Sequence, residues 1–225
     1  MQECVPVIAI DGPTASGKGT VAGMVAEKLG FHYLDSGALY RLAAYSCLES
    51  GVDLEDAEAC ASIARKMRPV FQGGRIYLAQ NDVTDSIRAE QVGLAASKVA
   101  AYPSVRAELQ DLQRRARTSP GLVADGRDMA SVVFPDALLK VFLTASAQAR
   151  AERRYKQLIA KGFSANLSDL ARDLEERDRR DRERAAAPCV PAGDAHILDS
   201  SELTIDETVG AVLEWWKAVA EKSRQ

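Results

Sequence analysis

Five short apolar runs, each ending in polar residues, alternate along the chain with segments of helical spacing. The runs lie at residues 7–10, 31–37, 121–128, 138–145 and 196–201. The first run, Val-Ile-Ala-Ile, is continuous, which is typical of a strand buried on both faces of a parallel sheet. Strands that alternate with helices predict right-handed crossovers and ligands beyond the carboxyl ends of the strands. The pattern therefore predicts an α/β fold with a five-stranded parallel sheet flanked by helices.

The pattern changes between residues 61 and 103. Two extended arms surround Gly73 and Gly74, and Asn81-Asp82 follows, which predicts an insertion with antiparallel strands. Helical spacing resumes from Ser86. Further on, two charged helical segments meet at a short turn near Gly162, an arrangement that predicts a short helical lid.

A glycine-rich loop follows the first predicted strand and precedes a helical segment. Its sequence, GPTASGKGT, comprises Gly12, Pro13, Thr14, Ala15, Ser16, Gly17, Lys18, Gly19 and Thr20. The spacing from Gly12 through Gly17 to Lys18 matches the P-loop, in which backbone N–H groups and a helix N-terminus surround a polyphosphate. The usual pattern has Ser or Thr directly after the lysine to bind Mg²⁺. Here Thr20 stands one residue later and is the expected Mg²⁺ ligand.

Composition narrows the function classes. The chain has 225 residues, 47% hydrophobic and 27% charged, with a net charge of −3. This length suits one domain, and the charge offers no general attraction for nucleic acid or an anionic membrane. Four scattered cysteines without a CxxC pair argue against a zinc site. No apolar run approaches the roughly 20 residues that a bilayer requires, and no export signal is visible, so a cytoplasmic location is expected.

The arginine-rich segment at residues 166–184 has two possible interpretations. From Arg172 to Arg184 it carries six Arg and six Asp or Glu, so it is a poor binder of a nucleic-acid backbone. An apolar stripe along one helix face continues into charged residues, in the order Leu167, Leu170, Leu174, Arg177, Asp181 and Arg184. This face would suit an anionic ligand that bears hydroxyl groups. Salt bridges between neighbouring turns are the alternative.

Four blocks in this order resemble the bacterial cytidylate kinase family of P-loop nucleoside monophosphate kinases: GPTASGKGT, LDSGALYR, ADGRDMASVVFP and RDRRDRERA. The resemblance implies a P-loop core at about residues 1–60, 104–150 and 185–225, a monophosphate-binding insertion at about 61–103 and a lid at about 151–184. It also implies phosphoryl transfer from ATP, with Mg²⁺, to CMP or dCMP. A monomer without nucleic-acid or membrane partners is expected.

The resemblance also assigns site residues. Lys18 would hold the transferring phosphate, and Arg153 and Arg154 of the lid would act on ATP. Ser36, Arg41 and Arg127 would meet the acceptor's phosphate region, with Arg184 nearby, and Tyr40 is a further expected substrate-binding residue. Arg177 and Asp181 resemble a sugar-binding pair, while Ser97, Arg106 and Asp128 resemble the group that recognises cytosine. Ala130 and Ser131 depart from the family's usual Gly and Thr, which puts the local backbone approach in question.

Three alternatives remain open at this point. The first is a P-loop kinase for another small acceptor, such as UMP or AMP. The second is a nucleotide-binding switch protein, against which the downstream arginine clusters argue, since a switch needs no second anion site. The third is an RNA-binding module, whose affinity would depend strongly on salt.

Overall fold

The structure, a computed structural model, describes residues 5–160, 162 and 164–222. It divides into two compact units, one formed by Met1–Asp35 with Ala116–Gln225 and the other by Ser36–Arg115. Each unit is described by itself. The limits expected for core, insertion and lid were defined by function, whereas these two units are defined by packing, so those limits stay a prediction. Residues 1–4, 161, 163 and 223–225 fall within those limits but lie outside the described part of the chain.

In the described part of the first unit, five strands form one parallel sheet in the order β2-β6-β1-β7-β8. Val7 of β1 lies opposite Leu122 of β6, and Asp35 of β2 lies opposite Asp125 of β6. The strands are β1 (Val7–Asp11), β2 (His32–Asp35), β6 (Leu122–Gly126), β7 (Leu139–Thr144) and β8 (His196–Asp199). Because β1 lies at the centre of the sheet, both of its faces are buried and its run is continuously apolar. The predicted parallel sheet is confirmed.

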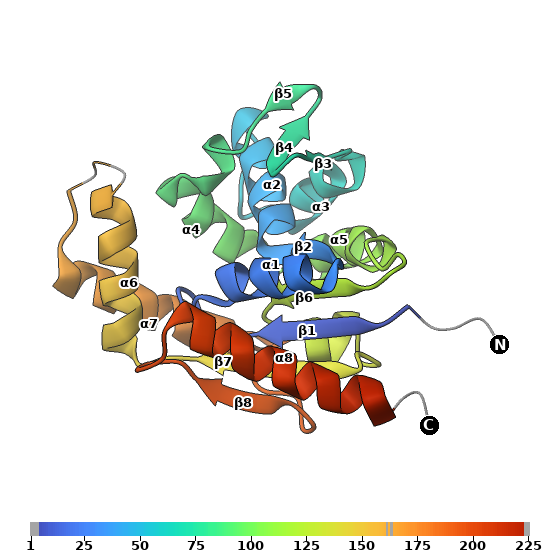
Figure 1. Cartoon of the computed structure of the whole chain (residues 1–225). Coiled ribbons are helices and arrows are strands. Elements are labelled where there is room, and N and C mark those ends of the chain that lie inside the picture. The colour runs from blue at the N-terminus through green and yellow to red at the C-terminus, as the bar shows by residue number, and fades with distance from the viewer. Residues whose placement is uncertain (1–4, 161, 163, 223–225) are drawn as a thin grey trace. The chain divides into compact units, whose positions relative to one another are not determined.

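Two helices, α1 (Lys18–Leu29) and α8 (Ile205–Lys222), pack against the sheet of this unit (Figure 1). Phe31 meets Trp216 of α8 edge to face, with ring centroids 5.5 Å apart. The shared core combines strand residues with helix residues at helical spacing: Ile8, Ile10, Val123, Leu139, Val141 and Leu143 with Val21, Val25, Val209 and Val212. This core fixes the N-terminus of α1 beyond the carboxyl end of β1.

The remaining helical elements of the first unit are α6 (Ala147–Ala160), α7 (Leu167–Glu183) and a π-helix, η2 (Met129–Val133). Helices α6 and α7 pack on each other. Asn166 caps α7, because its side chain accepts a hydrogen bond from the Ser168 amide at 2.9 Å. None of the helices in the described residues combines the length and apolar character needed to cross a membrane.

The second unit carries its own small sheet, in which β3 (Val70–Gln72), β4 (Arg75–Leu78) and β5 (Asn81–Asp82) are antiparallel. This confirms the predicted insertion with antiparallel strands. The helices are α2 (Ser36–Glu49), α3 (Ala57–Lys66), α4 (Glu90–Val99) and α5 (Pro103–Arg115), with a 3-10 turn, η1 (Ser86–Arg88). Helix α2 packs against α4, and helix α3 packs against α5. The helical spacing that begins at Ser86 corresponds to the turn η1 and the helices α4 and α5.

Candidate active site

The loop at residues 12–17 joins β1 to α1 and makes one unusually close contact. Gly12 has φ +154°, and a Cβ atom there would lie 2.0 Å from the carbonyl oxygen of Leu143 in β7. Ala15 has φ +60°, a left-handed conformation that is uncommon for alanine. The loop then delivers the chain to Gly17 and the first turn of α1. Free N–H groups at this helix N-terminus form a binding site for an anion.

Lys18 is the cation of this loop. Its side chain is buried, and Nζ donates to the carbonyl oxygen of Pro13 at 3.2 Å. Burial, together with the nearby Arg127 charge, lowers the pKa of Lys18 to about 8, although Asp125 and Asp35 oppose the shift. An anion in the loop would favour the charged form of Lys18. Lys18 is thus a buried cation beside the backbone of the loop.

Two carboxylates face each other at the ends of neighbouring strands, Asp35 of β2 and Asp125 of β6. The Tyr33 hydroxyl donates to Asp125 Oδ1 at 2.7 Å. Burial and the Asp35 charge raise the pKa of Asp125 to about 7. A Cβ atom on Gly19 would lie 3.9 Å from Asp125 Oδ2, so this carboxylate borders the first turn of α1. These oxygens form a negative rim beside Lys18.

Arg127, directly after β6, uses all three of its nitrogen atoms. Nε donates to Asp181 Oδ2 at 2.9 Å, Nη1 to the Gly126 carbonyl at 3.2 Å and Nη2 to Thr14 Oγ1 at 2.7 Å. Burial disfavours the charged guanidinium, but Asp181 outweighs it and holds the pKa of Arg127 above its usual value. Burial also works against the Asp181 carboxylate, yet Arg127 keeps its pKa low. The pair is therefore ionised inside the protein.

The other predicted residues of the arginine-rich segment gather around the same carboxylate. Arg184 Nη1 lies 4.0 Å from Asp181 Oδ1, and Arg184 Nε donates to the Ala187 carbonyl at 2.7 Å. Arg177 lies one turn earlier on α7, and its charge contributes to the low pKa of Asp181. The face of mixed charge expected on this helix is thus present. The ion pair of Asp181 with Arg127, at 2.9 Å, joins two different elements rather than neighbouring turns of one helix.

Asp128 is buried and directly precedes the π-helix η2. The backbone that follows is fixed by Asp11 at the end of β1, which accepts from the amides of Met129 at 2.9 Å and Ala130 at 2.8 Å. Burial raises the pKa of Asp11 to about 6 in spite of these two donors. Ala130, where the resembled family has glycine, is buried and held by its backbone amide. The backbone that carries Asp128 is therefore well anchored.

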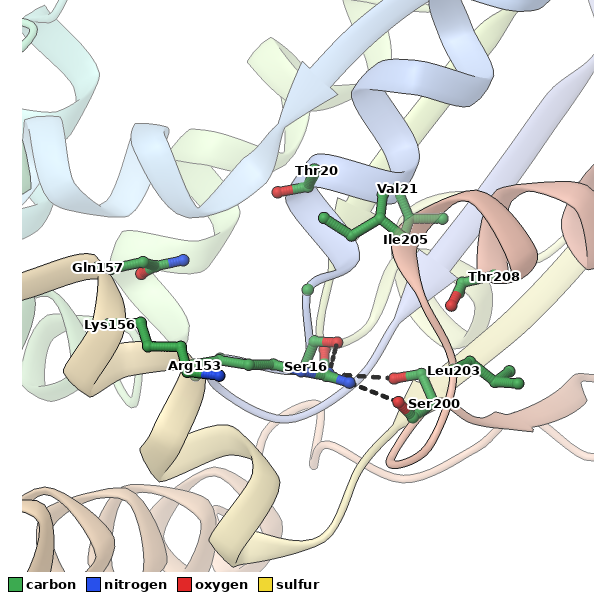
Figure 2. Close-up of a pocket in the computed structure, with 12 residues that line it drawn as sticks. Ser16, Thr20, Val21, Arg153, Lys156, Gln157, Ser200, Leu203, Ile205 and Thr208 are labelled. Carbon is green, nitrogen blue, oxygen red and sulfur yellow. Dashed lines mark hydrogen bonds between the residues drawn. The ribbon is translucent and has the colours of Figure 1, made fainter. Parts of the chain in front are cut away.

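A cavity of about 270 Å³ lies beside the phosphate loop. Figure 2 shows Arg153 of α6 in its wall, with Nη1 donating to the Ser16 carbonyl at 3.0 Å and to Ser200 Oγ at 3.2 Å. Nη2 donates to the Ser200 carbonyl. The lining residues are Ala15, Ser16, Gly17, Thr20, Val21, Arg153, Lys156, Gln157, Ser200, Leu203, Ile205 and Thr208. Of the two predicted lid arginines, Arg153 lines the cavity and Arg154 does not.

In the second unit, Tyr40 and Arg41 of α2 are each held by a neighbouring segment. The Arg106 guanidinium of α5 lies 5.5 Å above the Tyr40 ring and donates to the Ala100 carbonyl at 3.2 Å. Arg41 Nη1 donates to the Ile87 carbonyl at 3.0 Å. Two arginines are thus oriented within this unit.

Of two predicted serines, Ser36 is buried, whereas Ser97 is half-buried with its Oγ atom inside the protein. Ser36, the first residue of α2, and Ser97 of α4 belong to the second unit. Within the described residues, the buried Ser97 Oγ has no hydrogen-bond partner, and the same holds for Ser16 Oγ in the phosphate loop. A buried hydroxyl group without a hydrogen-bond partner lowers the stability of the protein. Such groups therefore suggest sites where a polar ligand binds.

In the first unit, hydrogen bonds and ion pairs join Lys18, Arg127, Arg153, Asp181 and Arg184 to the phosphate loop or to one another, and these residues form a first group. In the second unit, the Arg106 guanidinium lies over the Tyr40 ring. Three further side chains beside the first group were not singled out from the sequence: Asp11, Tyr33 and Ser200. Asp125, at the carboxyl end of β6, likewise has no role assigned from the sequence. Their only signal in the sequence was a position at or near a strand end, because hydrogen-bond partners far apart in the chain leave no local pattern.

Comparisons with known proteins bear on this site. The family model for cytidylate kinase matches residues 8–218. A cytidylate kinase of Polynucleobacter asymbioticus is 59% identical over 214 residues, which cover 95% of this chain and 97% of that protein. One from Cupriavidus necator is 60% identical over 215 residues, covering 96% and 97%. A solved gluconokinase structure from Sinorhizobium meliloti has a TM-score of 0.50 at 17% identity, covers 100% of this chain and 98% of that one, and shares the fold alone. With both a whole-length family match and close relatives, the chain belongs to the cytidylate kinase family.

Proposed function

We propose that this protein transfers the γ-phosphoryl group of ATP to CMP or dCMP, giving ADP and CDP or dCDP. The observation that carries the proposal is the family match over residues 8–218. The phosphate loop around Lys18 and the buried arginine Arg127 support it, because phosphoryl transfer between two nucleotides needs a donor site and a second anion site.

The donor would occupy the loop and the adjoining cavity. Backbone amides at the N-terminus of α1 and the Lys18 ammonium would hold the β- and γ-phosphates. The apolar side chains of Val21, Leu203 and Ile205 in the cavity wall would pack against the base and sugar. Arg153 would add positive charge from the same wall, where it now binds Ser16 and Ser200.

The acceptor needs no catalytic base, because its phosphate oxygen is already ionised. Arg127 would align this phosphate with the γ-phosphoryl group and spread positive charge around the loose transition state. Its planar guanidinium stays charged and binds phosphate through two nitrogens. The proposed acceptor site also includes Ser36 and Arg41 for phosphate with Arg184 nearby, Arg177 and Asp181 for the sugar, and Ser97, Arg106 and Asp128 for cytosine. Tyr40 would be a further substrate-binding residue.

The residues beside Lys18 suit Mg²⁺. The Thr20 hydroxyl on the first turn of α1, together with the Asp35 and Asp125 carboxylates, supplies the hard oxygen donors that this ion prefers. The described residues contain no group of three or more His, Cys, Asp or Glu side chains arranged to hold a metal by themselves. Thr20 would therefore hold an ion that arrives with the nucleotide. Bound Mg²⁺ would neutralise charge on the β- and γ-phosphates.

The proposal includes a monomeric cytoplasmic enzyme without nucleic-acid or membrane partners. The net charge of −3 and the equal numbers of acidic and arginine residues in segment 172–184 support the absence of a polyanion partner. ATP and CMP are cytoplasmic nucleotides, which supports the location.

A coupled ADP-release assay with ATP and a panel of CMP, dCMP, UMP and AMP tests the function. Turnover should be fastest with CMP or dCMP. Lys18→Ala should lose most of it while remaining folded, because the lysine acts on charge that develops during transfer. Lys28→Ala, an exposed lysine at the other end of α1, is the matched control. Absence of turnover with every pyrimidine acceptor would refute the proposal.

A further inference from the structure

Thr14, in the middle of the phosphate loop, is held through all of its polar groups by three charged side chains. Its amide donates to Asp178 Oδ1 at 3.3 Å, and its carbonyl accepts from Arg150 Nη1 at 3.1 Å. Its hydroxyl oxygen accepts from Arg127 Nη2 at 2.7 Å. These partners come from α7, α6 and the segment after β6. The position and orientation of this one residue are therefore fixed from three directions.

Two of the three partners form a buried ion pair. Arg150 Nη1 lies 2.5 Å from Asp178 Oδ2, and the side chains are only 7% and 6% exposed. Arg150 Nε also donates to the Ala145 carbonyl at 3.0 Å, which ties the first turn of α6 to the end of β7. A buried pair of this kind is weak evidence for stability, since removing two charges from water offsets most of their attraction. Its contacts with Thr14 indicate another role.

The same contacts connect the loop to the proposed acceptor arginine. Asp178 and Asp181 lie one turn apart on α7. Asp178 binds Thr14, whereas Asp181 binds Arg127, and Arg127 in turn binds the Thr14 hydroxyl. The hydrogen bonds thus form a closed ring that runs through Thr14, Arg127 and one turn of α7. Movement of the loop would disturb Arg127 as well.

We propose that Arg150 and Asp178 are positioning residues, which hold Thr14 so that the donor loop and Arg127 keep a fixed geometry. This inference rests on the proposed kinase function. Both residues act through Thr14 and are buried away from the cavity beside the loop. Phosphoryl transfer depends almost wholly on alignment and charge, and a displacement of about 1 Å at such a site costs up to about 100-fold in rate.

Three variants test this role against a merely structural one. Asp178→Ala removes the acceptor for the Thr14 amide, and Asp178→Asn retains it through the amide oxygen. The double variant Arg150→Met with Asp178→Leu replaces the ion pair by apolar side chains of similar size, a change that often preserves stability. Asp169→Asn is the matched control, because Asp169 lies on the same helix in an exposed ion pair with Arg172.

We expect Asp178→Ala and the double variant to lower kcat at least tenfold and to raise the KM for ATP, and the KM for CMP should rise as well because Arg127 loses its fixed position. Asp178→Asn should recover part of the loss, and Asp169→Asn should match the parent. The Tm of the double variant should stay near that of the parent. Since the double variant lacks an unpaired buried charge, it keeps the test valid if Asp178→Ala does not fold.

Parental kcat in the folded double variant would overturn the proposal, as would equal losses in Asp169→Asn and Asp178→Ala. A fall in Tm without a fall in kcat would leave the ion pair with a structural role only. If the parent itself phosphorylates no nucleoside monophosphate, the proposed function fails, and ATP affinity then decides the positioning role. About tenfold weaker ATP binding by the double variant supports it, and unchanged binding refutes it.

Discussion

The Arg153 guanidinium donates to the backbone carbonyl of Ser16 at 3.0 Å, so a helix outside the core of the sheet reaches into the phosphate loop. The same side chain spans the loop and the segment after β8 through Ser200 (Figure 2). Arg154, the next residue, does not line the cavity. The two arginines of the proposed lid are therefore not equivalent.

Arg153→Ala should lower kcat about tenfold or more and raise the KM for ATP, because it removes a cation from the wall of the donor cavity. Arg154→Ala should lower kcat less than Arg153→Ala does. Neither change should alter the preference between CMP and UMP. Steady-state kinetics of the two single variants checks this, and a greater loss in Arg154→Ala would reverse the assignment.

The lowered pKa of Lys18, about 8, predicts how ATP affinity depends on pH. The charged form binds phosphate and is lost as pH rises through 8, so affinity should fall about tenfold between pH 7 and pH 9. Calorimetric titration with ATP at both pH values measures it. Lys18→Met, which has no charge to lose, should bind weakly and equally at both, and a parental pH dependence in this variant would assign the effect to another group.

Asp128 carries the prediction on base choice. An ionised carboxylate only accepts hydrogen bonds, so it favours the cytosine amino group over the uracil carbonyl by about 1 to 3 kcal/mol, or five- to 150-fold in kcat/KM. Asp128→Asn should narrow the CMP-to-UMP ratio, mainly through loss of CMP activity. Arg127 already has Asp181 as an anionic partner. An unchanged ratio with equal losses on both substrates would contradict base recognition.

Gly93 of α4 tests the phosphate role of Arg41 without changing Arg41. A Cβ atom there would lie 3.0 Å from both Nη1 and Nη2 of Arg41, so Gly93→Ala should displace the guanidinium. Alanine favours a helix by about 1 kcal/mol, which protects stability. The KM for CMP should rise severalfold while the KM for ATP stays constant.

The matched control for this variant is Gly210→Ala in α8, where a new Cβ atom meets nothing within 4 Å. It should change neither KM. If Gly93→Ala behaves like Gly210→Ala in kinetics, Arg41 does not hold the acceptor in the geometry that the second unit shows.

Asp125 predicts a pH dependence of stability. The pKa of Asp125 is raised in the folded protein to about 7 from an ordinary value of 3.8. The contribution of this residue to the free energy of unfolding is therefore fully present below pH 3.8 and is lost as pH rises through 7. Asp125→Asn should therefore gain stability relative to the parent, by on the order of 2 kcal/mol more at pH 8 than at pH 5. Urea unfolding at both pH values measures the difference, with Asp169→Asn as control. An equal gain at both pH values would place the raised pKa elsewhere.

The sheet and the phosphate loop could be predicted because their signals are local. The continuous run at Val7–Ile10 reports a strand buried on both faces, and the glycine spacing before Lys18 reports a loop around an anion. The start of α7 was only partly local, since Asn166 and Ser168 are both short polar residues that suit a helix N-cap, and the structure has Asn166 in that position.

The connections within the site could not be predicted in the same way. Asp11 binds amides more than 115 residues later in the chain, and Thr14 binds Asp178 across 164 residues. Such contacts depend on how the strands order themselves in the sheet, which periodicity does not encode. Arg153 and Arg154 are neighbours on α6 and point about 100° apart, so which of them meets the phosphate loop depends on how α6 packs, a tertiary property.

The close approach of Gly12 to Leu143 means that the first glycine of the motif is required by the packing of the loop against β7, whether or not a nucleotide is ever bound. A relative that lacked the lysine at position 18 would still need this glycine to fold. Gly12 is therefore under selection for folding, whereas Lys18 is under selection for activity. A related chain that keeps Gly12 but lacks Lys18 would be expected to have the fold without the activity.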